Sequence, residues 1–128
     1  MNDPIVTDAR GSVADAVQSL ERELSTRGIQ IFARIDHAGG ARAVGLELAD
    51  EVVLVFGNPA VGTSLMQQDP IAGLDLPLRM LVWDENGRTR VAFHDPRDLV
   101  HRYELVEHAG VLDKLHALLV SLAASLGG

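Results

Sequence analysis

The sequence predicts an α+β domain in which helices pack on one face of a mostly antiparallel sheet. Three observations support this class. Apolar and polar residues alternate in several short runs, two of which flank Asn86-Gly87. Apolar residues at helical spacing follow Ser12, and a leucine-rich stripe at the same spacing occupies residues 111–126. The predicted order is strand, helix, four strands and a long helix, with short helical pieces between strands.

The first half of this order begins with a short strand at residues 5–7. Ser12 is a good N-cap with Asp15 three residues later, so a helix follows and ends before Gly28. The next run has period two, which predicts a strand with one buried face, made of Ile29, Ile31, Ala33 and Ile35. Phe32 adds an apolar residue to the other face. Asp36 then caps a helical turn that Gly45 stops.

The second half begins with an apolar run at residues 52–56, which is too short for a buried helix and predicts a central strand covered on both faces. Asn58 before Pro59 predicts an N-cap and the start of a short helix that ends before Pro70. Asn-Gly at residues 86–87 predicts a tight hairpin between two strands. A turn follows Asp95-Pro96, and the long helix ends the order.

The length of 128 residues predicts one domain over residues 1–128, with one core. Cysteine is absent, so disulfides and thiolate chemistry are excluded. The first residues lack the basic and apolar regions of a signal peptide, and charged residues interrupt the apolar C-terminal run. A cytoplasmic protein without membrane insertion is therefore expected.

The formal net charge is −7, and the acidic residues are spread along the chain. A sequence-independent nucleic-acid binder needs a basic stripe, which is not visible, and aromatic residues for stacking are few. The composition therefore predicts no nucleic-acid partner.

Several short motifs, taken together and in order, resemble the DUF302 family. The matching pieces are Ile35-Asp36-His37-Ala38, Gly45-Leu46-Glu47-Leu48, Val55-Phe56-Gly57-Asn58-Pro59, Gly62-Thr63, Leu65-Met66-Gln67 and Asp75-Leu76-Pro77-Leu78-Arg79. The resemblance implies a helix-grip or TBP-like arrangement, β-α-β(4)-α, which agrees with the order above. It implies no activity, because the family is one of uncharacterised function. Gly39-Gly40 and Ser64 depart from the family's pattern.

Asp36 and His37 adjoin a predicted strand end. They have two interpretations: an acid–base pair or ligand contact, or a helix cap beside a surface histidine. Adjacent strand residues point to opposite faces, which favours the second interpretation. Asn58 likewise has two interpretations, a ligand-binding amide or a helix cap, and the cap also explains Gly57 and Pro59.

Arg79 falls on the strand face opposite Leu78 and Met80, beside Leu81 and Trp83. An arginine among apolar residues usually has a carboxylate partner or an anionic ligand. Asp75 and Asp36 are the candidate partners, and the sequence leaves ion pair and ligand contact equally open.

The histidines show no metal-ligand spacing, and neither a phosphate-binding loop nor a nucleophile motif is present. No metal and no cofactor are therefore predicted. The first hypothesis is a module that binds a small polar or anionic molecule through Asp36, His37, Asn58, Asp75 and Arg79. The alternatives are a self-associating structural domain, and a small hydrolase or isomerase with Asp36 or His37 as its base. A homodimer is expected, because the sheet has edges to cover and the resemblance points the same way.

Overall fold

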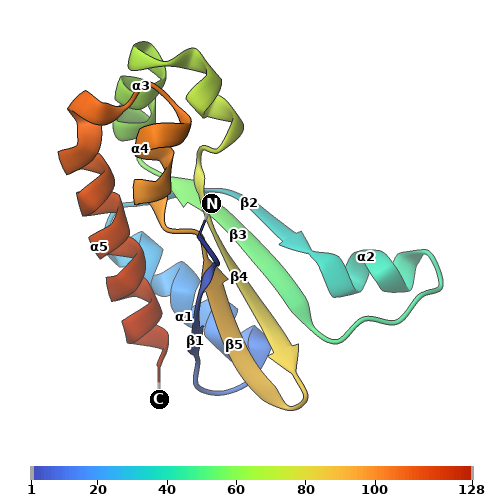
Figure 1. Cartoon of the computed structure of the whole chain (residues 1–128). Helices are drawn as coiled ribbons and strands as arrows, with labels where there is room; N and C mark the ends of the chain where they lie inside the picture. The colour runs from blue at the N-terminus through green and yellow to red at the C-terminus, as the bar shows by residue number, and fades with distance from the viewer. Residues whose placement is uncertain (1, 128) are drawn as a thin grey trace.

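The structure is a computed structural model that describes residues 2–127, and it confirms the predicted α+β class and order (Figure 1). The strands are β1 (Ile5–Asp8), β2 (Gln30–Asp36), β3 (Glu51–Gly57), β4 (Leu78–Glu85) and β5 (Arg88–Phe93). The helices are α1 (Val13–Thr26), α2 (His37–Ala43), α3 (Pro59–Gln68), α4 (Leu99–Arg102) and α5 (Ala109–Leu126). Three 3₁₀ helices are η1 (Pro70–Leu74), η2 (Pro96–Asp98) and η3 (Val106–His108).

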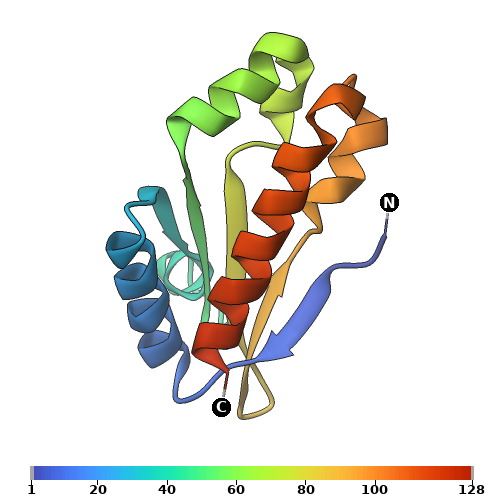
Figure 2. The ribbon, with the colours of Figure 1, turned by 90° about the vertical axis from the view of Figure 1, so that its left-hand side faces the viewer.

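The five strands form one sheet in the order β1-β5-β4-β3-β2, and every neighbouring pair is antiparallel. β3 is paired on both sides, but the prediction of a central strand covered on both faces is wrong in two respects. β4 occupies the middle of the sheet, and α1 and α5 cover one face of β3, whereas Val55 on the other face is half-buried. β1 and β2 are the two edges. The helices α1 and α5 lie side by side on one face, whereas α2 projects from the end of β2 on the opposite side (Figures 1 and 2).

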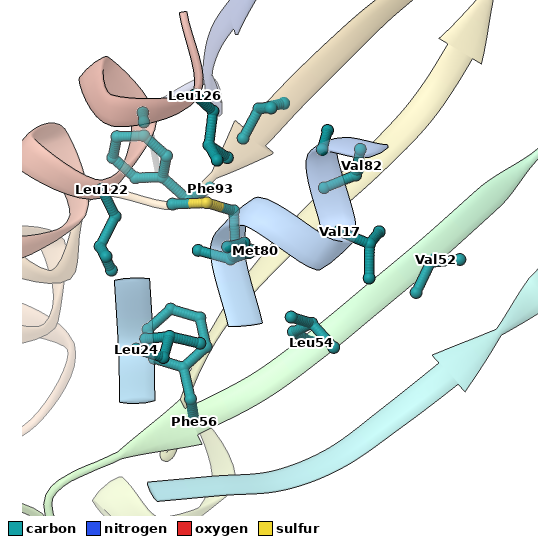
Figure 3. Close-up of a cluster of buried hydrophobic side chains, with 14 of the residues drawn as sticks. Val17, Leu24, Val52, Leu54, Phe56, Met80, Val82, Phe93, Leu122 and Leu126 are labelled. Atoms are coloured by element: carbon teal, nitrogen blue, oxygen red, sulfur yellow. The ribbon is translucent and has the colours of Figure 1, made fainter. Parts of the chain in front are cut away.

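The main core lies between the sheet and the pair α1 and α5 (Figure 3). Every second residue of β3 and β4 points into it, because side chains alternate across a strand. Leu54, Phe56 and Met80 are completely buried there. The apolar stripes of the two helices cover them with Val17, Leu20, Leu24, Leu119, Leu122 and Leu126.

The predicted helix and turn signals are present at the atomic level. Ser12 and Asp15 form a capping box at α1, with reciprocal hydrogen bonds of 3.1 Å. Asn86 and Gly87 have φ values of 53° and 88°, and a two-residue hairpin of type I′ needs positive φ at both positions. The hairpin between β4 and β5 is thus formed by local turn chemistry.

A β-bulge in β2 changes the predicted burial of that strand. Ile31 pairs with Phe56, but Ala33 pairs with the preceding residue of β3, Val55. Phe32 is the extra residue between them, so the alternation of faces shifts by one position. A shift of one position moves the following side chains to the other face.

The predicted buried face of β2 is therefore wrong beyond the bulge. Ile35 lies on the face away from α1 and α5 and is 45% exposed. Arg34 takes the place on the helix side, where its guanidinium lies 3.0 Å from the carboxylate of Glu21 on α1.

The bulge also helps to define an open face of the sheet, opposite α1 and α5. Cross-strand partners point to the same face, so the pairing identifies its members. The open face carries the apolar residues Val6, Ala33, Ile35, Val53, Val55, Leu81, Trp83 and Ala92 and the charged residues Asp8, Glu51, Arg79, Glu85, Arg88 and Arg90. Within the described chain only the α2 region lies on its side.

The helix α5 contributes to a second, smaller core, in which Leu112 packs with Leu65 of α3, Leu99 of α4, and Ala72 and Leu105 from the connecting loops. The segment Val106–Leu126 is long and apolar enough to cross a membrane, judged by length and composition alone. In this fold its buried side chains pack against the sheet and the smaller core, which accounts for part of that apolar character.

Candidate functional site

The five predicted site residues lie in three places. Asp36 pairs with Val52 near one end of β3, and Asn58 follows the other end, six residues later. At about 3.3 Å per residue, these two ends are about 20 Å apart. Asp36 and Asn58 therefore belong to different parts of the surface.

Asp36 acts as a helix cap. Its Oδ1 accepts a hydrogen bond of 2.8 Å from the backbone N–H of Gly39, in the first turn of α2. A Cβ atom at Gly39 would lie 2.5 Å from the Asp36 carboxylate, so glycine leaves the space that the cap needs. His37, the first residue of α2, is exposed and forms no hydrogen bond or ion pair within residues 2–127.

A small cleft of about 230 Å³ lies where β4 begins and β5 ends, beside η2 and α4. It contains two of the predicted residues, Asp75 and Arg79. Its other polar lining residues are His94, Asp95, Asp98 and Arg102, and the apolar part of the wall includes Leu119 of α5. We call this the polar cleft.

Asp75 is held by two residues that follow the polar cleft in sequence. Its Oδ2 accepts hydrogen bonds of 2.5 Å from the Tyr103 hydroxyl and 3.2 Å from Arg102 Nη1. The Tyr103 bond, followed by the charge and hydrogen bond of Arg102, lowers the pKa of Asp75, although partial burial opposes this. The positive charge of Arg79 lowers the pKa of Asp75 further.

Arg79 forms an ion pair with neither of its two candidate partners, Asp75 and Asp36, so of the two possibilities left open by the sequence the ion pair is absent among residues 2–127. Arg102 occupies the position beside Asp75, and Asp36 lies on the helix side of the sheet while Arg79 belongs to the open face. Arg79 is exposed at the edge of the polar cleft and makes no ion pair or hydrogen bond to any residue between 2 and 127. Its guanidinium keeps all its donors for other groups.

The other carboxylates of the polar cleft already have partners. Asp95 binds Arg97 in a bidentate pair with distances of 3.0 and 2.7 Å, and this contact lowers the pKa of Asp95. Asp98 accepts a hydrogen bond of 2.9 Å from the neutral amide of Asn2 and forms no ion pair among residues 2–127. Arg79 is the cation of the polar cleft that has no partner in the described part of the chain.

Asn58 lies at a second, larger cleft of about 550 Å³ between α3, α5 and the end of the sheet. We call this the apolar cleft, because most of its wall is hydrocarbon. Asn58 Oδ1 accepts a hydrogen bond of 2.9 Å from Ala60 N, so the predicted N-cap of α3 is formed. Pro77 and Leu78 line both clefts and separate them.

This arrangement does not assemble the predicted catalytic set. Asp36 and Arg79 lie on opposite faces of the sheet, so a base at Asp36 cannot act on an anion held by Arg79. Within residues 2–127, no group of three or more histidine, aspartate and glutamate side chains is arranged to hold a metal ion.

Sequence reasoning missed Arg102 and Tyr103, which hold Asp75. Arg102 ends the short helix α4, which has no periodic pattern, and Tyr103 follows it; the two lie 27 and 28 residues from Asp75. The one visible signal is composition, because Tyr103 is the only tyrosine of the chain.

Comparisons with known proteins agree with this architecture. A family model described as "Domain of unknown function DUF302" matches residues 5–122. The chain belongs to the DUF302 family. A crystal structure of an uncharacterised conserved DUF302 protein from Bacillus stearothermophilus has a TM-score of 0.86 and covers 96% of this chain and 97% of its own. It shares 18% sequence identity with this DUF302 domain, and the likeness therefore concerns the fold.

Curated relatives of this DUF302 domain are named as fluoride-specific ion channels. A protein from Brucella suis is 36% identical over 102 residues, which cover 79% of this chain and 40% of that protein. A Brucella abortus protein shows the same identity, with 38% of its length covered. The chain thus spans about 40% of the length of the curated relatives that it matches.

Proposed function

We propose that this DUF302 domain is a binding module for a small molecule with an anionic group, which it holds in the polar cleft through Arg79. The observation that carries the proposal is the free guanidinium of Arg79 in a cleft where Asp75 and Asp95 are already paired with Arg102 and Arg97. A guanidinium with free donors binds carboxylate or phosphate oxygens in a bidentate manner.

The geometry around Arg79 favours recognition over catalysis. Asp75 is fixed by Arg102 and Tyr103, and its lowered pKa keeps it ionised near neutral pH. An ionised, fixed carboxylate accepts hydrogen bonds from a ligand but is a weak base. The polar cleft therefore suits a ligand that offers an anionic group to Arg79 and a donor group to Asp75.

The size of the polar cleft restricts the ligand. Its volume of about 230 Å³ is below the roughly 300–1,000 Å³ of sites for drug-sized molecules. A small carboxylate, phosphate, zwitterion or inorganic anion fits this limit. Fluoride belongs in the set to be tested, because curated relatives that share this domain are named as fluoride channels.

The experiment is a thermal-shift screen with sodium salts of fluoride, chloride, acetate and phosphate, and with small zwitterions such as glycine. At least one compound should stabilise the wild-type protein in a concentration-dependent manner. Arg79→Met keeps most of the apolar stem and removes the charge, so this variant should fold and lose the response.

Arg22→Met is the matched control, since Arg22 is an exposed arginine of α1 that contacts only Ser19 among the described residues. This control should keep the ligand response. An equal response in wild type and Arg79→Met, or an equal loss in both variants, would contradict the proposal.

A second candidate function, self-association, is supported by the open face. Its side chains Val55, Leu81 and Trp83 are only half-buried, and Ile35 at the edge strand is 45% exposed. Exposed apolar patches of this kind mark contact surfaces, and a second copy of the chain would cover this one.

A further inference from the structure

The apolar cleft lies between two helices at one end of the sheet. In Figure 2 α3 and α5 stand apart at this end, and side chains of both line the cleft. Val61, Leu65 and Met66 of α3 face Val111, Leu115 and Leu118 of α5. Phe32, the bulge residue of β2, completes the wall. The cleft volume of about 550 Å³ lies within the range of small-molecule sites.

The side of α5 that lines the apolar cleft differs from its core side. The lining positions 111, 114, 115 and 118 recur at helical spacing, so they form one stripe along the helix. A second stripe, with Leu112, Leu119 and Leu122, is buried in the two cores. α5 therefore has two apolar stripes, and the protein's own side chains cover only one of them completely.

Lys114 lies in the middle of the cleft stripe and is the only lysine of the chain. It is the only lining residue of the apolar cleft with a formal charge, and within residues 2–127 it forms no ion pair or hydrogen bond. Asn58 and Thr63 are the other polar side chains of the wall. A single free cation on a hydrocarbon wall is complementary to a molecule with an apolar body and one anionic group.

The exposure of two apolar side chains supports the inference that a molecule binds in the apolar cleft. Phe32 is 43% exposed and Met66 is 36% exposed, and both line the apolar cleft. Aromatic and thioether groups adapt well to apolar ligands. Gly62 of α3 also faces this space, and a Cβ atom there would make only ordinary contact, 3.8 Å from Met66 Cε.

We propose that the apolar cleft binds a free amphiphilic carboxylate, with its hydrocarbon chain between α3 and α5 and its carboxylate on Lys114 Nζ. This site is separate from the polar cleft and does not depend on Arg79. The occupant follows from charge complementarity: a neutral apolar molecule leaves the ammonium unpaired, and a cationic amphiphile is repelled by it.

The test uses three probes of equal chain length: dodecanoate, dodecanol and dodecyltrimethylammonium, each below its micelle concentration. Isothermal titration calorimetry measures affinity, and native mass spectrometry measures stoichiometry. Dodecanoate should bind one to one, about tenfold more tightly than dodecanol, because only its carboxylate pairs with the ammonium. Dodecyltrimethylammonium should bind most weakly.

Variants at Lys114 and Gly62 test separately the charge and the free volume of the apolar cleft. Lys114→Met should lower dodecanoate affinity to that of dodecanol, and Lys114→Arg should restore the preference. Gly62→Leu places a side chain in the apolar cleft and should abolish binding of both probes. Arg22→Met is the matched control for the loss of a charge, and Arg79→Met tests the polar cleft; both should bind dodecanoate as wild type does.

Two results would overturn the proposal: no dodecanoate binding up to about 1 mM, or equal affinities of wild type and Lys114→Met. Lys114 is exposed, so its substitution tests the site even where Gly62→Leu fails to fold. Loss of a dimer in Gly62→Leu, with no dodecanoate binding to the wild type, would assign the apolar cleft to a second copy of the chain instead. Binding to phosphatidylglycerol vesicles without binding of free dodecanoate would assign it to a membrane surface. Either result refutes a site for free carboxylates.

Discussion

Tyr103 donates a hydrogen bond of 2.5 Å to Asp75, which lies 28 residues earlier, and joins the residue after α4 to the loop before β4. Arg102 binds the same carboxylate, and Asp69 accepts a hydrogen bond of 3.0 Å from the backbone N–H of Glu104. Two separate loops are thus fixed to each other by carboxylates. These contacts position one wall of the polar cleft.

The first prediction concerns the acid dependence of this contact. The folded-state pKa of Asp75 is below its ordinary value of 3.8, first because of Tyr103. A lowered folded-state pKa stabilises the protein above the unfolded-state pKa, and this stabilisation is lost as pH falls through the folded-state pKa. Tyr103→Phe should therefore raise the pKa of Asp75, as measured by NMR titration of its carboxyl carbon.

The stability difference between wild type and Tyr103→Phe should shrink as the pH falls from about 5 towards 3. The pKa of Tyr103 itself is raised, because its hydroxyl donates a hydrogen bond to the Asp75 carboxylate that ionisation of Tyr103 would break. The hydrogen bond of Tyr103 therefore stabilises the folded protein below pH 10, and this stabilisation is lost as the pH rises through the raised pKa of Tyr103. A stability difference between wild type and Tyr103→Phe that stays constant across the whole pH range would show that the hydrogen bond is not coupled to the titration of Asp75 or Tyr103.

The second prediction compares two neighbours on β3. Leu54 is completely buried between the sheet and α1, whereas Val55 is half-buried on the open face. Leu54→Ala should lower the free energy of unfolding by about 2–5 kcal/mol, since it leaves a cavity in close-packed surroundings. Val55→Ala should cost about 1 kcal/mol. Urea denaturation measures the free energy of unfolding of both variants. Similar losses in the two variants would mean that the open face is as closely packed as the core.

The third prediction uses two glycines. Gly87 has a φ of 88° in the hairpin, and Gly110 is helical in α5 with no atom within 4 Å of an added Cβ. Gly87→Ala should destabilise the protein by about 1 kcal/mol, because side chains disfavour positive φ. Gly110→Ala should stabilise it by up to about 0.5 kcal/mol through helix propensity. A destabilised Gly110→Ala variant would contradict the helical assignment at that position.

The order of elements could be predicted because each depends on local signals. The capping box at Ser12, the N-cap at Asn58 and the Asn86-Gly87 turn act within a few residues of themselves. The bulge at Phe32 could not be predicted. Ile31, Phe32 and Ala33 are all apolar, so alternation there does not indicate which residue is extra.

The candidate site was predictable only in part. Asp75 and Arg79 lie at the same cleft because they are neighbours in sequence, with the start of β4 between them. Asp75, a candidate partner of Arg79, pairs with Arg102 instead, and Arg102 reaches it only after α4 packs beside η1 in the smaller core. Asp36 ends β2 and Asn58 follows β3, but antiparallel pairing places these two strand ends at opposite ends of the strand pair.

The last prediction is that the protein is a homodimer through the open face. Light scattering at about 50 µM should give the mass of two chains. In a two-fold interface each substitution occurs twice, so Ile35→Glu places two carboxylates in one apolar contact and should shift the mass to one chain. Ile35 is 45% exposed, so this variant should stay folded, which circular dichroism verifies.

Val120→Glu is the matched control, because Val120 is 44% exposed on α5, on the opposite side of the sheet. It adds the same charge at the same exposure and should leave the dimer intact. A monomeric wild type would refute self-association outright. If Ile35→Glu leaves the dimer intact and Val120→Glu disrupts it, the interface lies on the helical side of the sheet. The reason is that an unpaired carboxylate buried in an interface destabilises the dimer.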